Sequence, residues 1–87
     1  MSDLEMYPIA VVQDRYGGCY SKGEWLVISK TTHLENGAYR IIRCLDGDPH
    51  GEDFDAQLFW RDPPEWIAAG KTPEEAIANL RKKLGFG

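Results

Sequence analysis

The chain has 87 residues, of which 43% are hydrophobic and 28% charged, and its formal net charge is -4. This length and composition predict a single folded domain, residues 1–87, and exclude a disordered chain. The acidity argues against direct nucleic-acid binding, which needs clustered Lys and Arg. No apolar run could span a membrane, and the polar start, MSDLEMYP, lacks the apolar segment of a signal peptide, so we expect a cytoplasmic protein.

After a flexible lead-in at residues 1–6, several segments have the composition of β-strands. The segment 54–60 alternates, which would place Phe54, Ala56, Leu58 and Trp60 on one face. Asn36-Gly37 is the strongest short cue for a β-hairpin. We therefore predict strands at residues 7–14, 25–30, 39–45, 54–60 and 65–69, with a hairpin turn at 34–37 and a polar loop at 46–53.

The last element, at residues 72–84, is predicted to be a helix. Thr72 is placed as its N-cap, and Pro73 fits the first helical position. Glu75 completes a capping box with Thr72, and Gly85 can close the helix in a left-handed conformation. The apolar residues that share one face of this helix are Ala76, Ile77, Leu80 and Leu84.

Strands followed by one terminal helix predict an α+β fold. We expect an antiparallel sheet of four to five strands, with the C-terminal helix packed on one face and the other face partly open. A meander of this kind leaves unpaired backbone donors and acceptors at its edges. We therefore expect a homodimer formed through a sheet edge.

Cys19 and Cys44 are too few for a disulfide scaffold and lack the spacing of metal ligands. A redox pair or a reactive thiol would be the functional interpretation. We prefer two small half-buried residues on strands, because cytosolic thiols stay reduced. No metal or other cofactor is predicted.

Two blocks of the chain resemble the HicB antitoxin family of toxin–antitoxin systems. The first, residues 7–20, has an apolar strand, an acidic residue and a Gly-Gly turn. The second, residues 60–76, has an aromatic residue, a proline step, a short strand and a Glu-Glu-Ala helix start. Its matching residues are Trp60, Asp62, Pro64, Gly70, Thr72, Glu74, Glu75 and Ala76.

The resemblance leaves the middle of the chain, residues 25–59, without a counterpart, and Lys71 replaces the family's usual acid. It implies a protein-binding domain of partial ribonuclease-H-like topology without catalysis. In the family a further strand and often a DNA-binding module follow the helix. The sequence stops at Gly87, so the resemblance does not carry over a DNA-binding role.

Aromatic residues give the first candidate contacts for a partner protein. Tyr16 and Tyr20 flank a glycine-rich connection, where tyrosines offer a large amphipathic contact area. The alternative is that they cover a sheet edge. Trp66 follows two prolines and is expected to be partly exposed as an interface anchor, with core packing as its alternative.

An acidic loop gives the second candidate surface, which would attract a basic partner. Its partner-binding residues would be Asp46, Asp48, Glu52 and Asp53. A calcium loop is the competing interpretation, but Pro49 and His50 are poor ligands and position twelve is Gln57 rather than Glu. A solvated connection without any partner is the simplest alternative.

Catalysis has little support in the sequence. His33 and His50 are the only histidines, and neither has a nucleophile signature nearby. An enzyme would need a pocket and a titrating group such as Asp14 or His50. We therefore predict no catalytic residues.

These patterns favour a non-enzymatic protein-binding module that neutralises or regulates a partner, as an antitoxin does. The alternative is a phage-encoded inhibitor of host defence, similar to anti-CRISPR proteins, which would present its acidic loop to a nucleic-acid-binding groove. Charge reversal at Asp48, Glu52 and Asp53 separates the two hypotheses, because only the second predicts a loss of binding. An uncharacterised small enzyme is the third possibility.

Overall fold

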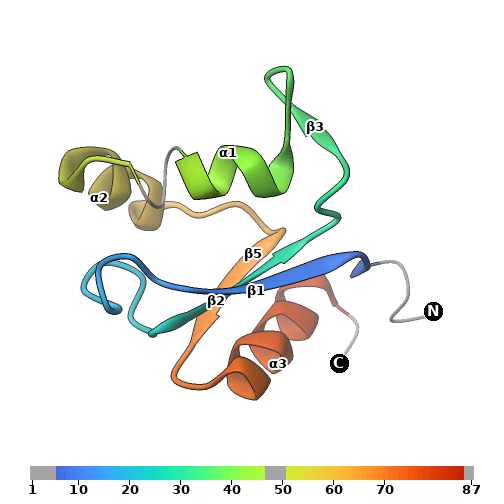
Figure 1. Cartoon of the computed structure of the whole chain (residues 1–87). Helices are drawn as coiled ribbons and strands as arrows, with labels where there is room; N and C mark the ends of the chain where they lie inside the picture. The colour runs from blue at the N-terminus through green and yellow to red at the C-terminus, as the bar shows by residue number, and fades with distance from the viewer. Residues whose placement is uncertain (1–5, 47–50, 86–87) are drawn as a thin grey trace.

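The computed structural model describes residues 6–46 and 51–85, and Figure 1 shows how their helices and strands are arranged. The α+β class predicted from the sequence is confirmed. The elements in chain order are β1 (Ile9–Gln13), β2 (Trp25–Ser29), β3 (Leu34–Glu35), β4 (Ala38–Tyr39), α1 (Arg40–Asp46), α2 (Asp53–Arg61), β5 (Ile67–Gly70) and α3 (Pro73–Leu84).

Three strands form the main sheet in the order β1-β2-β5, and both pairs are antiparallel. Val27, in the middle of β2, lies opposite Val11 of β1 and Ala68 of β5. All of β2 after Trp25 is buried. A run of apolar residues is therefore expected in this strand, because helices cover both faces of the sheet.

α3 covers one face of the sheet, as predicted. Its start is fixed by the Thr72 hydroxyl, which accepts a hydrogen bond from Glu75 N at 3.1 Å. Gly85 ends it in the left-handed conformation, with φ of 83°. The core on this side consists of Met6, Val27, Ala68, Ala76 and Leu80.

Replacing Thr72 by alanine is expected to lower the free energy of unfolding by about 1 kcal/mol, because one N–H of the first turn loses its acceptor. Urea unfolding followed by circular dichroism would measure the change. Thr72→Ser keeps the hydroxyl and is the matched control, so it should stay close to the original stability. Equal losses in the two variants would contradict the capping role.

The opposite face of the sheet is not open, which corrects the prediction made from the sequence. α1 and α2 lie over it, as Figure 1 shows. Ile28 of β2 and Ile67 of β5 form a second buried cluster there with Cys44 of α1. The partly buried residues packed against this cluster are Val12, Ile41, Phe59, Trp60 and Trp66. The protein therefore has three layers instead of two.

The strand predicted at residues 39–45 is wrong, because residues 40–46 form α1. Ile41 and Cys44 are three residues apart, so a helix turns both toward the sheet, whereas a strand would send them to opposite faces. Burying this pair together favours the helix. Cys44 is thus a buried helical residue, and Cys19 is exposed in a turn, so neither cysteine lies on a strand.

The strand predicted at residues 54–60 is also wrong, because α2 occupies residues 53–61. The apolar residues of this segment fit both an alternating and a helical pattern. In the helix, Ala56, Phe59 and Trp60 face inward, whereas Phe54 and Leu58 are exposed. Acidic residues in the first turn and an arginine in the last turn also suit the helix dipole.

β3 and β4 form a separate two-stranded hairpin, and the Asn-Gly prediction is confirmed. Asn36 and Gly37 have φ values of 53° and 85°, as required in the tight turn that matches strand twist. α1 follows β4 directly. The hairpin therefore determines where α1 begins.

Candidate protein-binding surface

Four large hydrophobic side chains are exposed on the β3–β4 hairpin and on α1. Leu34 and Tyr39 are opposite each other in the hairpin register, so their side chains share one face. Ile42 and Leu45 are three residues apart on α1 and lie on one side of that helix. Their exposed fractions are 65% for Leu34, 50% for Tyr39, 48% for Ile42 and 46% for Leu45. We call these four residues the apolar surface.

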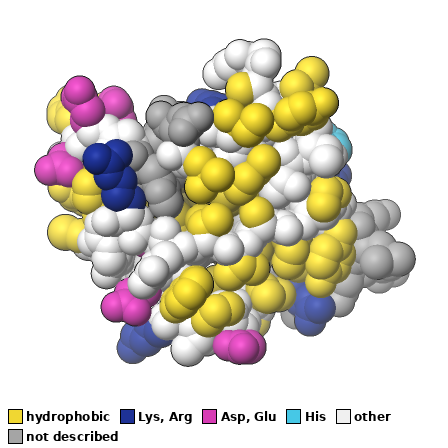
Figure 2. Space-filling view, in the orientation of Figure 1, with side chains coloured by type: hydrophobic (Ala, Val, Ile, Leu, Met, Phe, Trp, Pro, Cys, Tyr) yellow, Lys and Arg dark blue, Asp and Glu magenta, His cyan; other side chains and the backbone are white. Residues whose placement is uncertain are grey.

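Figure 2 shows the face that carries this surface, with hydrophobic side chains gathered over the hairpin, α1 and β1. α1 contacts both strands of the hairpin, so the four residues belong to one neighbourhood. Single exposed apolar residues are normal, but a cluster of this kind marks an interaction site or a groove for a ligand.

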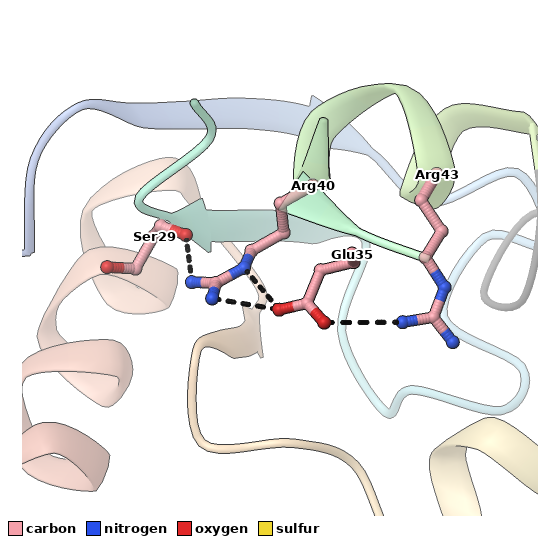
Figure 3. Close-up of polar contacts among 4 residues, drawn as sticks. All are labelled: Ser29, Glu35, Arg40 and Arg43. Carbon is pink, nitrogen blue, oxygen red and sulfur yellow. Dashed lines mark hydrogen bonds and ion pairs between the residues drawn. The ribbon is translucent and has the colours of Figure 1, made fainter. Parts of the chain in front are cut away.

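Arg40 anchors the apolar surface to the sheet. Its guanidinium donates to the Ser29 carbonyl of β2 at 2.7 Å and to Glu35 of the hairpin at 3.0 Å (Figure 3). It also lies over the Trp66 ring, 4.6 Å from the ring centroid. One buried cation therefore connects β2, β3 and the segment before β5 at the point where α1 begins.

The predicted partner-binding residues fall into separate places. Trp66 is partly exposed, as expected; it lies beneath Arg40 and also packs against the second core cluster. Tyr16 and Tyr20 are half-buried and form an edge-to-face pair, with ring centroids 5.4 Å apart. The structure brings the two tyrosines to the start of α2 and does not bring Trp66 to them.

The tyrosine pair ties the glycine-rich turn to the acidic segment. The Tyr16 hydroxyl donates to the Gly51 carbonyl. Burial raises the pKa of Tyr16 and of Tyr20 above the ordinary tyrosine value. Arg15 opposes this shift at Tyr16, whereas Asp53 adds to the pKa of both. Both hydroxyls thus stay protonated at neutral pH, which suits hydrogen-bond donation more than acid–base chemistry.

The predicted acidic surface is described only in part. Glu52 and Asp53 are exposed at the start of α2, next to the exposed Asp55. Asp48 and the side chain of Asp46 lie outside the described residues. Within residues 6–46 and 51–85, no three His, Cys, Asp or Glu side chains are grouped closely enough to hold a metal ion.

Asp14 has a structural task in the turn that follows β1. It is buried, and its carboxylate accepts from Gly18 N and from the Ser21 hydroxyl, both at 2.8 Å. It also accepts from Tyr16 N at 3.2 Å. A carboxylate that accepts three hydrogen bonds from its own turn fixes the conformation of that turn.

A shallow hollow of about 450 Å³ lies beside this turn. Gly17, Gly18 and Gly23 supply backbone, and Lys22, Glu24 and Lys71 supply charges. The lining contains no histidine, cysteine or serine that could act as a nucleophile. His33, the histidine that the structure describes, is exposed and lies elsewhere, beside Arg40 and Trp66.

Comparisons of the chain with protein-family models, with curated proteins and with solved structures find no match. The resemblance to HicB therefore stays a prediction. No helix among the described residues has the length and apolar character needed to cross a bilayer.

The sequence prediction missed the apolar surface because it assigned residues 39–45 to a strand. In a strand, Ile42 and Leu45 point to opposite faces and form no patch. The useful signal was two interleaved pairs at a spacing of three, Ile41 with Cys44 and Ile42 with Leu45. Ile41 and Cys44 face the core, and Ile42 and Leu45 face solvent. This is the pattern of a helix that has one buried and one exposed apolar face.

Proposed function

We propose that this chain is a small non-enzymatic protein-binding module that neutralises or regulates a partner protein, as the HicB resemblance implies. The observation that carries the proposal is the apolar surface, formed by the hairpin and α1. Aromatic and aliphatic side chains exposed together gain free energy when a partner covers them, and such residues dominate binding at the centre of interfaces.

The two HicB-like blocks are joined through β2, a strand that has no counterpart in the resemblance. β1 with its glycine turn, and β5 with α3, both pack directly on β2. Segments far apart in sequence thus form one unit. The unmatched middle of the chain supplies the central strand β2, the hairpin and α1, so residues with no counterpart in the family carry the apolar surface and would give this module its own partner specificity.

The test is site-specific photo-crosslinking in extract of the native cells. A photoreactive amino acid in place of Tyr39 should capture one protein, whereas the same group in place of the exposed Ala78 of α3 should not. The captured protein is identified by mass spectrometry. Expression of the captured protein alone should arrest growth or produce a measurable enzymatic activity. Co-expression of this chain should reverse that effect. Equal capture at both positions would contradict the proposal.

Polar substitution measures how much the apolar surface contributes. Ile42→Ser with Leu45→Ser should weaken binding of the captured partner at least about tenfold, because exposed side chains at such a site lose their buried contacts. Both residues are about half exposed, so the fold should tolerate the change. Isothermal titration calorimetry with the purified partner gives the dissociation constants.

A second candidate function is inhibition of a nucleic-acid-binding protein of host defence through the acidic start of α2. The exposed carboxylates of Glu52, Asp53 and Asp55 favour it, since they could occupy a basic groove. Glu52→Lys with Asp53→Lys distinguishes the two candidates. Loss of binding in this variant, with binding retained in the serine variant, would support the second candidate, and the reverse result would support the first.

A further inference from the structure

The two outer strands of the main sheet, β1 and β5, differ in whether the backbone groups at their free edges have hydrogen-bond partners. At β5, Ser29 N donates to Trp66 O at 2.8 Å, which sets the register so that Ile67 and Ala69 direct their backbone groups away from β2. α3 supplies donors to both of these carbonyls. Lys83 Nζ donates to Ile67 O at 2.6 Å, and Asn79 Nδ2 donates to Ala69 O at 2.8 Å. Both outward carbonyls of the β5 edge are therefore occupied.

The β1 edge has no such protection. Asp14 N donates to Glu24 O at 2.6 Å, so the alternate residues Ala10 and Val12 pair with β2. Ile9, Val11 and Gln13 consequently direct their N–H and C=O groups outward. Within the described ranges, 6–46 and 51–85, no side chain makes a hydrogen bond to these outward groups.

The sequence of β1 lacks the usual devices that keep an edge strand from pairing. Residues 7–13 carry no charge. Charged side chains, especially Lys, commonly protect exposed edges. Pro8 does not protect it either, because its backbone faces the other way, and its carbonyl accepts from Thr31 N at 3.1 Å. β1 is therefore an uncharged edge strand whose outward backbone groups are available for pairing with another strand.

We propose that β1 pairs antiparallel with β1 of a second copy of this chain, about a two-fold axis at Val11. In this register Val11 lies opposite Val11 of the other copy, and Ile9 lies opposite Gln13. The residues with outward backbone groups then face one another, so each finds its partner and none is left over. Two three-stranded sheets become one continuous sheet.

The side chains fit the same register. Val11 shares a face with Ile9 by alternation, and α3 packs mainly on β2 and β5. Val11 is left 39% exposed at the middle of the strand. At the two-fold axis it would be covered by its own copy, forming a cross-strand pair of β-branched residues, which is a favourable pair in sheets. A neutral strand also brings no like charges together.

This pairing is independent of the proposed function, since β1 shares no residue with the apolar surface. The test uses opposite charges at the axis. Val11→Lys and Val11→Glu should each weaken self-association at least about tenfold, because like charges then lie directly opposite each other. Mixing the two variants should restore a dimer, since opposite charges then meet. Val11→Thr, neutral and β-branched, should remain dimeric.

Light scattering after gel filtration gives the masses, and circular dichroism checks folding. A second readout on the unchanged chain is hydrogen exchange, in which the Val11 and Gln13 amides should become more protected as protein concentration rises. This readout decides alone if the charged variants do not fold. A monomeric unchanged chain, charged variants that remain dimeric, or a mixture that stays monomeric would overturn the proposal. None of these results bears on the crosslinking at Tyr39.

Discussion

Replacing Gly70 by alanine is expected to lower the free energy of unfolding by about 3 kcal/mol, the overpacking cost of a methyl group that has no space. A Cβ at Gly70 would lie 2.8 Å from Ala76 Cα and from the Glu75 carbonyl carbon. Both are backbone atoms of α3, so no side-chain rotation can relieve the contact. The helix would have to move away from β5 and open the core beneath it.

Urea unfolding measures this loss, and Gly17→Ala is the control. Gly17 has φ of 64°, and a Cβ there would meet nothing within 4 Å. Its substitution should cost only the strain of a left-handed residue, about 1–2 kcal/mol. If Gly70→Ala were no more destabilising than Gly17→Ala, the close approach of α3 to β5 would be contradicted.

The same close packing extends to the turn that precedes β2. A Cβ at Gly23 would lie 2.6 Å from Gly70 N. Gly23, Gly70 and α3 are thus stacked backbone against backbone. The turn before β2 and the end of β5 meet at this point, so Gly23 and Gly70 each have a steric reason to lack a side chain.

Replacing Arg40 by methionine is expected to destabilise the protein by about 2–3 kcal/mol, because removing one partner leaves buried polar groups unpaired. The buried Ser29 carbonyl loses its donor and Glu35 loses its closest cation. Methionine keeps the length of the side chain over the Trp66 ring, so the loss reports mainly on charge and hydrogen bonding.

Arg43→Met is the matched control, because Arg43 approaches the same carboxylate from the same helix. Its Nη1 is 4.0 Å from Glu35, and its side chain is 31% exposed against 9% for Arg40. A partly exposed ion pair of this kind contributes about 0–1 kcal/mol. Thermal and urea unfolding should therefore separate the two variants clearly, and similar losses would contradict the anchoring role of Arg40.

The parts of the fold that could be predicted depend on local chemistry. The helix at the end of the chain has a hydroxyl cap, a proline in its first turn and a closing glycine, all within one short segment. The hairpin turn needs only Asn36 and Gly37 in left-handed conformations. Each of these elements is determined by neighbouring residues, so the sequence pattern was sufficient.

α1 and α2 could not be predicted in the same way, because their conformation depends on burial against β2. Burial of Ile41 and Cys44 together in the second core stabilises the helix. This contribution depends on contacts with the sheet and cannot be inferred from the segment alone. Short segments rich in Ile, Phe and Trp have strand propensity, which tertiary packing overrides. The candidate surface was missed for the same reason, since it lies on the outer side of one of these helices.

The donors that α3 places over β5 limit how far strand pairing can proceed. A chain with two open edges can recruit a neighbour on each side, which builds a filament without end. Here Asn79 and Lys83 occupy the outward carbonyls at the β5 edge. In the proposed dimer, pairing at β1 would use the open edge of each copy, so assembly would end at two chains, and the helix that completes the core would also limit further strand pairing.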